Sequence, residues 1–422
     1  MTIEIVREAG ASGRPFALTL NANARRDAPW TPAQDDILND AAFEQARETI
    51  SSWPGYAPTP LVALPGLAKE AGVAGLYYKD ESGRFGLGSF KALGGAYAVA
   101  RLLQRQVETA LGAPVPMADI VSGAHADRVA EITVCCATDG NHGRSVAWGA
   151  RTFGCNCVIF IHETVSEGRK RAIEQYGAEV RRCAGNYDDS VREAQATAAR
   201  EGWFVVSDTS YEGYMEVPKD VMQGYEIMAA EALDELDVPP THIFLQTGVG
   251  GMAAAVVALA KRRWGAEKPA IVLADPERSA CWLDSFRAGR PTVVDGDLDT
   301  LMAGLACGEV SALAWEILKD HADAAMAVPD EAAVDLMRRL ANPAAGDTPV
   351  VAGESAVAGL AGLMAAMGDA EARMALGLGP ASRALVFGTE GDTDPELYKK
   401  LVGTDGGEVR RRAAAATTGA PS

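Results

Sequence analysis

The sequence of 422 residues lacks the patterns that build disulfide frameworks and metal sites. Its seven cysteines include no CxxC pair, and its five histidines are scattered along the chain. A disulfide framework needs a high density of regularly spaced cysteines, and a zinc site needs a cluster of cysteine or histidine ligands. The composition therefore argues against a disulfide scaffold, and we expect no metal cofactor.

Long apolar runs and an excess of positive charge are also missing. No stretch is apolar over the length of a bilayer, and the charged N-terminus has no signal-peptide core. Lysine and arginine number 39 against 57 aspartates and glutamates, which gives a net charge of −18. This charge repels nucleic acid and anionic membranes. We therefore expect a cytoplasmic enzyme that acts on a small molecule, with no nucleic-acid or membrane partner.

Short apolar runs alternate with segments of helical periodicity along most of the chain. Such alternation predicts an α/β fold with parallel-rich sheets and helices on both faces. The first 30 residues resemble an arm, and the low-complexity segment 410–422 predicts a frayed or disordered tail. The predicted strands are 76–79, 132–137, 158–161, 204–206, 243–246, 271–274 and 384–387, and the clearest predicted helices are 167–176, 331–340 and 355–367.

One lysine lies where a glycine-rich loop becomes a helix. Lys91 follows a loop with glycines at 86 and 88, and Ser89 is positioned to cap the helix. Because Phe90 and Leu93 flank the lysine, we expect its amine to be partly desolvated. Desolvation lowers the pKa of a lysine and favours the nucleophilic neutral amine, as a Schiff base with an aldehyde requires.

Polar loops follow two of the predicted strands, at the edge where parallel sheets bind ligands. The first, 137–143, is dense in glycine and hydrogen-bonding residues, including Asp139 and Asn141, and precedes a helix. The amides at such a helix start suit a carboxylate. The second, 207–214, contains Asp208, which taken alone is equally compatible with a helix cap and with a catalytic group.

A glycine-rich turn between a buried strand and a helix predicts a phosphate site. Gly248, Gly250 and Gly251 leave backbone amides open at a helix N-terminus. The same letters satisfy a dinucleotide fingerprint, and Asp275 follows the next strand, so an NAD-dependent oxidoreductase is an alternative. A further loop at 388–393 carries Thr389, whose neutral hydroxyl could face a ring nitrogen.

The lysine, the glycine turn and the asparagine-containing loop together point to pyridoxal phosphate, in which the ring accepts electrons and the protein supplies orientation. The combination resembles the fold type II pyridoxal enzymes, the tryptophan synthase β family, from about residue 56 to 398. Within that family it is most similar to the ammonia-lyases that act on 2,3-diaminopropionate. The most specific pieces are 79–82, 84–91, 138–143 and 302–309.

The resemblance implies a role for each matching residue. Lys91 would carry the Schiff base, Asn141 would bind the 3-oxygen of the cofactor, and Thr389 would face its ring nitrogen. Asp139 and Asp208 would act as acid/base groups toward substrates of opposite α-configuration. The phosphate loop would consist of Gly248, Val249, Gly250, Gly251 and Met252.

Asp139 departs from the serine and threonine dehydratases, which carry a hydroxyl residue there. A carboxylate can receive a proton or pair with a β-ammonium, whereas a hydroxyl leaving group needs no anion. The implied reaction is α,β-elimination of ammonia from D- or L-2,3-diaminopropionate, which yields pyruvate and two ammonia molecules. A serine or threonine dehydratase, and a catalytically silent protein that binds pyridoxal phosphate, are the remaining alternatives.

The resemblance also implies two domains with the cofactor between them. We expect a large domain from 1–91 and 216–405, a small domain from 92–215, and a flexible tail from 406–422. A homodimer is expected. Cys281 and Cys307 lie in loop-like segments that the resemblance puts beside the substrate entrance, where the two could approach each other. Two thiols in a reducing cytoplasm are the alternative.

Overall fold

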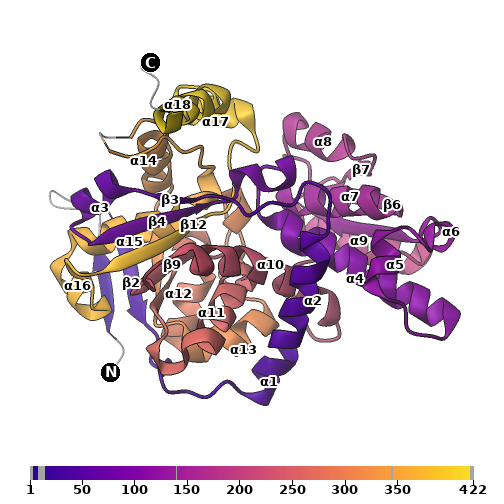
Figure 1. Ribbon diagram of the computed structural model, residues 1–422, viewed down its shortest axis with the longest axis horizontal. Coiled ribbons are helices and arrows are strands. Elements are labelled where there is room, and N and C mark those ends of the chain that lie inside the picture. Colours follow the sequence, from indigo (N-terminus) through magenta and orange to yellow (C-terminus); the bar gives the residue numbers. More distant parts are fainter. Residues whose placement is uncertain (1–2, 8–14, 139, 344–345, 419–422) are drawn as a thin grey trace. The chain divides into compact units, whose positions relative to one another are not determined.

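The computed structural model describes residues 3–7, 15–138, 140–343 and 346–418 (Figure 1). The chain divides into two compact units. The larger unit consists of Met1–Asp35, Pro58–Gly83 and Met228–Ser422, and the smaller unit consists of Asp36–Ala57 and Arg84–Ile227. Each unit has its own sheet, so each is described by itself.

An eight-stranded sheet forms the centre of the larger unit, in the order β1-β2-β11-β10-β9-β12-β4-β3. The five strands from β11 to β4 are parallel, whereas β1, β2 and β3 run antiparallel to their neighbours. The parallel strands are almost continuously apolar, as strands covered on both faces are. The strands are β1 (Glu4–Arg7), β2 (Phe16–Leu20), β3 (Leu61–Ala63), β4 (Gly75–Asp80), β9 (His242–Gln246), β10 (Ala270–Pro276), β11 (Ala324–Val328) and β12 (Arg383–Gly388).

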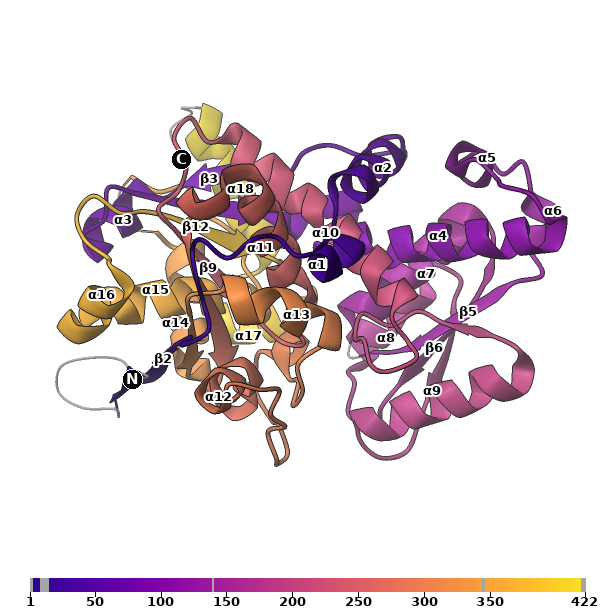
Figure 2. The same ribbon diagram turned by 90° about the horizontal axis from the view of Figure 1, so that it is seen from below.

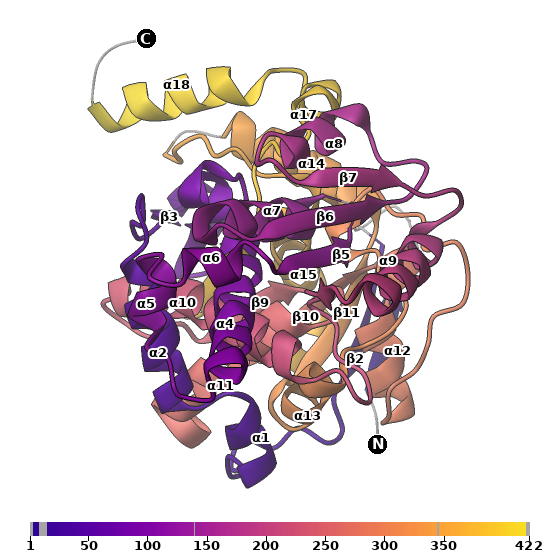
Figure 3. The ribbon, with the colours of Figure 1, turned by 90° about the vertical axis from the view of Figure 1, so that its right-hand side faces the viewer.

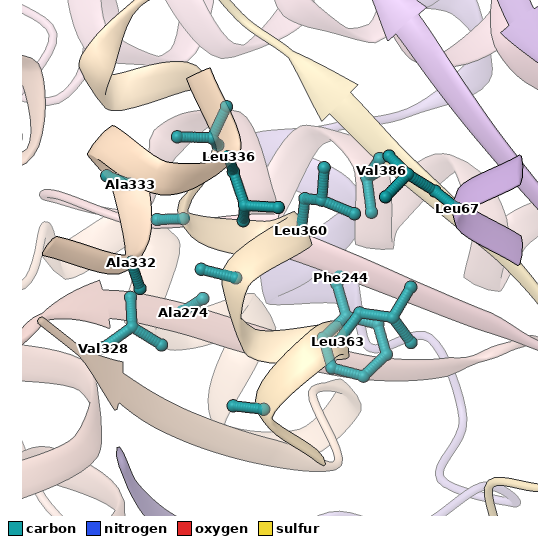
Figure 4. Close-up of a cluster of buried hydrophobic side chains, with 14 of the residues drawn as sticks. Leu67, Phe244, Ala274, Val328, Ala332, Ala333, Leu336, Leu360, Leu363 and Val386 are labelled. Atoms are coloured by element: carbon teal, nitrogen blue, oxygen red, sulfur yellow. The ribbon is translucent and has the colours of Figure 1, made fainter. Parts of the chain in front are cut away.

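The core of the larger unit lies where helix α15 (Ala358–Gly368) packs on β9 and β10. Leu360 and Leu363 point toward the sheet beside Phe244 (Figure 4). A Cβ atom on Gly359 would lie 2.7 Å from the Phe244 carbonyl oxygen, so this glycine permits the close approach. The other helices assigned mainly to this unit are α1 (Pro32–Ile37), α3 (Pro65–Ala71), α11 (Gly251–Trp264), α12 (Cys281–Ala288), α13 (Ala312–His321), α14 (Asp330–Ala341), α16 (Ala370–Leu376), α17 (Pro395–Val402) and α18 (Gly406–Thr418).

The smaller unit is built on a four-stranded parallel sheet in the order β7-β6-β5-β8. Helices α4 and α7 lie on one side of this sheet and α9 on the other (Figures 2 and 3). The strands are β5 (Thr133–Ala137), β6 (Asn156–Ile161), β7 (Glu179–Arg182) and β8 (Phe204–Val205). The helices are α2 (Asp40–Ser51), α4 (Lys91–Leu111), α5 (Met117–Val121), α6 (Ala126–Val129), α7 (Asn141–Phe153), α8 (Glu167–Glu174) and α9 (Tyr187–Glu201), while α10 (Glu216–Glu235) contributes residues to both units.

Parallel strands with helices on both faces confirm the predicted α/β class. The N-terminal arm supplies two strands, because β2 pairs with β11 and extends the large sheet. The segment expected to be a flexible tail is helical from Gly406 to Thr418. The sequence placed domain divisions at 91/92 and 215/216, whereas the compact units divide at 35/36, 57/58, 83/84 and 227/228. Within the described residues, no helix combines the length and apolar character needed to span a membrane.

Candidate active site

Lys91 is the first residue of α4. The N-cap position belongs to Phe90 and has no side-chain cap, so the prediction that Ser89 caps this helix is wrong. The Lys91 side chain is 19% exposed. Its Nζ lies 5.4 Å from the centre of the Phe90 ring and 5.8 Å from that of Tyr225. Aromatic rings therefore cover the amine, which is the partial desolvation that the sequence predicts.

Two glycines bring Tyr225 against the start of α4. A Cβ atom on Gly94 would lie 2.4 Å from the Tyr225 ring, and one on Gly224 would lie 2.2 Å from the carbonyl oxygen of Leu93. Real Cβ atoms do not approach this closely, so only glycine lets α4 and α10 pack backbone to backbone here. The tyrosine beside Lys91 is thus a consequence of helix packing.

The loop that leads into Lys91 is held by its own side chains. Phe85 has a left-handed backbone conformation with φ of 50°, and its ring lies 4.8 Å from that of Trp148. Arg144 Nη1 donates a hydrogen bond to the carbonyl oxygen of Leu87 at 2.8 Å. The strained backbone at Phe85 is therefore held in place by an aromatic contact and an arginine.

Asp208 is the partner that the structure gives to Lys91. It lies in the loop after β8, and its Oδ2 is 2.5 Å from Lys91 Nζ. Burial raises the pKa of the Asp208 carboxyl, but the charge of Lys91, the neighbouring His142 ring and the hydrogen bond from Lys91 outweigh it. The pKa is held well below its usual range. Asp208 is therefore a carboxylate while the lysine charge is present.

A tyrosine hydroxyl fixes the loop that carries Asp208. Tyr214 OH donates to the carbonyl oxygen of Val205 and accepts from the amide of Ser207, both at 2.9 Å. Val206 donates its amide to the carbonyl oxygen of Cys135, which ties the loop to β5. Asp208 is thus held close to the end of a strand, as functional groups in parallel sheets commonly are.

The sequence predicts that the turn before α7 binds the cofactor through Asn141 and acts on the substrate through Asp139. Thr138 Oγ1 accepts hydrogen bonds from the amides of Gly140 and Gly143, each at 3.0 Å. Asn141 begins α7 and belongs to the same unit as Lys91 and Asp208. Asp139 lies outside the described residues, so its predicted role stays a prediction.

His142 is a member of this group that the sequence reasoning did not assign. Its Nε2 lies 2.8 Å from the carbonyl oxygen of Val206, and its Nδ1 lies 3.8 Å from Asp208 Oδ2. The ring is buried, and burial, followed by smaller opposing effects of Asp208 and Lys91, lowers the pKa of His142. Residues Lys91, His142, Asp208 and Tyr225 are called the lysine cluster below. The signal in the sequence was the direct adjacency of His142 to Asn141.

In the larger unit, the predicted phosphate loop joins β9 to α11. Gly250 is the N-cap of α11, has φ of 99°, and leaves the helix start without a side-chain cap. A Cβ atom on Gly250 would lie 2.3 Å from the Trp282 ring, whose Nε1 donates to the carbonyl oxygen of Gly248 at 2.9 Å. Val249 accepts the amide of Ser311 through its carbonyl oxygen. Met252, the last residue of the predicted loop, is buried in the first turn of α11.

Thr389 lies at the end of the neighbouring strand β12. Its Oγ1 accepts a hydrogen bond from Gln246 Nε2 at 2.7 Å, and Gln246 ends β9 just before the glycine loop. The hydroxyl lies 3.5 Å from the carbonyl oxygen of Ser355, to which it donates. Because Gln246 donates to Thr389 Oγ1, the hydroxyl hydrogen of Thr389 points away from Gln246. The structure thus brings Thr389 and the glycine loop together at adjacent strand ends.

Asp275, which made a dinucleotide site conceivable, is fully engaged within the protein. Thr247 Oγ1 donates to its Oδ1 at 2.5 Å, and the amides of Trp282 and Leu283 donate to its Oδ2 at 2.9 and 3.0 Å. The residue is completely buried, and burial raises its pKa to about 7. Its carboxyl caps α12 and is closed to a ribose, so the structure argues against the dinucleotide alternative.

Both cysteines proposed to approach each other flank Gly248. Cys281 Sγ donates weakly to the carbonyl oxygen of Gly248 at 3.6 Å, and a Cβ on Gly248 would lie 3.0 Å from Cys307 Sγ. Cys281 begins α12, so its prediction as a loop residue is wrong. It is a buried thiol outside any disulfide, and the structure therefore holds no bridge between it and Cys307.

Comparison with known proteins places this arrangement in a family. A family model described as pyridoxal-phosphate dependent enzyme matches residues 52–387. The chain belongs to this family. Diaminopropionate ammonia-lyase from Escherichia coli (strain K12) is 40% identical over 375 residues, which cover 87% of this chain and 92% of that protein.

Two solved structures in the pyridoxal-phosphate dependent family resemble this fold. One is holo diaminopropionate ammonia lyase from Escherichia coli, with a TM-score of 0.84, 36% identity, and coverage of 93% of this chain and 98% of that chain. The other is the same enzyme in complex with D-serine, with a TM-score of 0.83, 35% identity and the same coverage. These findings confirm the predictions of a fold type II architecture and of pyridoxal phosphate as the cofactor.

The residues of the larger unit fit such a cofactor. The amides at the start of α11 have no side-chain cap, and glycines on both sides of Val249 keep side chains off the loop. A phosphate is the type of anion that such a helix N-terminus binds. The Thr389 hydroxyl is a neutral group suited to a ring nitrogen. The donor set therefore agrees with the requirements of the family's cofactor.

Proposed function

We propose that this protein eliminates ammonia from 2,3-diaminopropionate, with water converting the unsaturated product to pyruvate and a second ammonia. The observation that carries the proposal is the pairing of Lys91 Nζ with Asp208 Oδ2 at 2.5 Å in a desolvated setting. It joins a candidate covalent amine to a candidate base. The identity to diaminopropionate ammonia-lyase over most of both chains supports the choice of substrate.

By the family resemblance, each of the candidate residues would hold part of the cofactor. Lys91 would bind it covalently, Asn141 would bind its 3-oxygen, the amides of Gly248–Met252 would bind its phosphate, and the Thr389 hydroxyl would face its ring nitrogen. Pyridoxal phosphate, when bound, supplies an electron sink for the pair left on the α-carbon. The protein residues then have to orient the substrate and move its protons.

Asp208 would remove the α-proton of one enantiomer. The positive charge of Lys91 opposes burial in setting the pKa of this carboxyl. A loss of that charge would leave burial as the larger influence, raise the pKa of Asp208 and make it a stronger base. The proton would be taken at Oδ2, the oxygen that faces Lys91.

Two aspartates would serve two enantiomers. The α-proton must leave perpendicular to the cofactor ring, and mirror-image substrates present it to opposite faces. A single base cannot reach both faces. By the family resemblance, Asp208 would act on the L-isomer and Asp139 on the D-isomer. Asp139 would also favour an amine over a hydroxyl as the leaving group, because a carboxylate pairs with a β-ammonium.

The test is pyruvate release by the protein reconstituted with pyridoxal phosphate. We expect release from D- and L-2,3-diaminopropionate that clearly exceeds release from L-serine and L-threonine. Faster release from serine or threonine would identify a dehydratase instead. A characteristic visible cofactor band with no release from any of these amino acids would indicate a catalytically silent relative and overturn the proposal.

We also propose a cytoplasmic location and a homodimer. The acidic composition and the lack of a membrane-spanning helix among the described residues are consistent with this location. Light scattering during gel filtration measures the mass directly. A mass near one 44.2 kDa chain would overturn the dimer.

A further inference from the structure

His142 is a buried residue with one satisfied and one unsatisfied ring nitrogen. Its Nε2 lies 2.8 Å from the carbonyl oxygen of Val206, while its Nδ1 is buried with no hydrogen-bond partner among the described residues. Asp208 Oδ2 lies 3.8 Å from Nδ1. A buried polar atom without a partner is costly, so its position requires an explanation.

The tautomer of His142 follows from its backbone contact. A carbonyl oxygen can only accept a hydrogen bond, so Nε2 carries the hydrogen and Nδ1 of the neutral ring carries a lone pair. Burial lowers the pKa of His142 and keeps it neutral near pH 7. While Asp208 is ionised, its carboxylate carries no hydrogen that the lone pair on His142 Nδ1 could accept. It gains one only when Asp208 becomes protonated.

We propose that His142 is a positioning residue that accepts a hydrogen bond from Asp208 after Asp208 has taken the α-proton. The inference rests on the proposed function. The α C–H bond breaks, its electron pair stays with the carbon, and the proton forms an O–H bond at Asp208 Oδ2. That hydroxyl donates to His142 Nδ1. The electron pair on the α-carbon then forms the C=C bond, the β-ammonium takes the C–N electron pair and departs as ammonia, and Asp208 releases its proton to solvent.

The other titratable groups around Asp208 do not compete for this proton. Burial raises the pKa values of Cys136 on β5, Tyr214 on the Asp208 loop and Tyr225 on α10, so these groups stay neutral. The Tyr214 hydroxyl is already engaged with Val205 and Ser207. Lys91 on α4 donates to Asp208 while its amine is charged. His142 Nδ1 is therefore a buried acceptor, without a hydrogen-bond partner among the described residues, that is available to the protonated form of Asp208.

Two substitutions separate the two nitrogens of His142. The amide of His142→Gln can replace Nε2 and donate to Val206, but it removes the acceptor at the Nδ1 position. The shorter His142→Asn keeps an acceptor near Nδ1 and loses the bond to Val206. His242→Gln is the matched control, because His242 Nε2 makes a similar buried contact, 3.0 Å from the carbonyl oxygen of Leu376, in the larger unit.

The variants are reconstituted with pyridoxal phosphate and assayed on both enantiomers from pH 6 to 9. We expect His142→Gln to lower kcat for L-2,3-diaminopropionate at least tenfold or so, and to lower kcat for the D-isomer by less than about threefold. The acidic limb of the L profile should move to lower pH, because the protonated form of Asp208 has lost its acceptor. His142→Asn should retain more L activity, and His242→Gln should leave the D/L ratio unchanged.

Equal losses on both enantiomers, with the acidic limb in place, would overturn the inference and make His142 a purely structural residue. The tautomer gives a readout independent of activity. In protein with ¹⁵N-labelled histidine, the shifts of His142 should show hydrogen on Nε2 and a lone pair on Nδ1 at pH 7. Hydrogen on Nδ1 would contradict the inference. If the wild type released no pyruvate, the proposed function would fail, whereas the tautomer test would stand by itself.

Discussion

At the residue scale, the lysine cluster balances burial against charge. Burial favours the protonated form of Asp208, and the ammonium of Lys91 favours the carboxylate. Rings of Phe90 and Tyr225 limit the access of water to the amine. The same two groups, the amine and the carboxylate, are those that the proposed reaction uses. Substitution of either one therefore tests the assignment directly.

Lys91→Ala should abolish turnover while leaving some affinity for the cofactor. Loss of a covalent group costs several orders of magnitude in rate, whereas the glycine loop and Thr389 remain to bind pyridoxal phosphate. Pyruvate release and a fluorescence titration with pyridoxal phosphate measure the two effects. Lys69→Ala, which removes an exposed lysine of α3, is the control and should change neither. Substantial activity in Lys91→Ala would reject the assignment.

Asp208→Asn and Asp139→Asn should lose opposite enantiomers. Asparagine keeps the shape of the side chain and removes the base, so Asp208→Asn should retain D activity and Asp139→Asn should retain L activity. The loss for the affected isomer should be roughly 100-fold or more. Initial rates on each pure enantiomer provide the measurement. Equal proportional losses for both isomers in both variants would refute a two-base arrangement.

Asp139→Ser tests the choice of leaving group. Because a carboxylate pairs with an amine, this change should reduce elimination from 2,3-diaminopropionate more than elimination from serine. The ratio of pyruvate release from the two substrates, compared with the wild-type ratio, is the measurement. An unchanged ratio would mean that Asp139 supports its loop without selecting the substrate.

The sequence predicted some residue positions well and missed others. Lys91 could be placed at a loop–helix junction because glycines and flanking apolar residues are local signals. The contact of His142 with Asp208 could not be predicted, because it depends on the pairing of β5 with β8, whose residues are far apart in the chain. Tyr225 was missed for the same reason, since the packing of two helices brings it to Lys91.

At the element scale, the glycine loop depends on the absence of one side chain. Gly250→Ala should destabilise the protein and weaken cofactor binding, because the new Cβ would lie 2.3 Å from the Trp282 ring. The left-handed backbone costs about 1 kcal/mol for alanine, and the overlap adds about 1–3 kcal/mol. Urea unfolding and a cofactor titration measure the two effects.

Gly289→Ala is the matched control for that substitution. Gly289 ends α12 with φ of 66° and has open space where a Cβ would lie. The Gly289→Ala variant should lose only about 1 kcal/mol of unfolding free energy, from the left-handed backbone, and should keep its affinity for pyridoxal phosphate. Equal effects of the two substitutions would show that contact with Trp282 does not shape the loop.

Asp275 should make the stability of the protein depend on pH. Its pKa rises from 3.8 to about 7 on folding because it is buried. The native state therefore holds a proton that the unfolded state has released between these values, and stability from this group falls as pH rises through that window. Asp275→Asn should remove a slope of up to about 1.4 kcal/mol per pH unit, measured by urea unfolding from pH 5 to 8. Parallel curves for wild type and variant would contradict the expectation.

Strand prediction succeeded where apolar runs were long and failed where they were not. The central strands β9, β10 and β12 were predicted because they are buried on both faces and read as continuous apolar runs. Strand β11 is rich in alanine, which favours helices, and was missed. Strands β1 and β3 are short edge strands that pair with the nearby β2 and β4, and β2 also pairs with the distant β11.

At the scale of the whole molecule, cofactor binding should be measurable as stability. A ligand that binds only the native state adds free energy as its concentration exceeds the dissociation constant, about 2.7 kcal/mol at a 100-fold excess. Removal of pyridoxal phosphate should therefore lower Tm, and its return should restore Tm. Inorganic phosphate alone should restore less. No change in Tm on removal would argue against tight binding of the cofactor.

The interleaving of the two units also sets an order of events during translation. The smaller unit is complete once residue 227 has been made, before the ribosome reaches the glycine loop at 248. The large sheet cannot close so early, because Ala17 pairs with Ala327 and Leu76 with Ala384. Strands β2 and β4 therefore stay without these partners until the last third of the chain has been synthesised. The nascent protein thus acquires its lysine cluster before it can build a phosphate site.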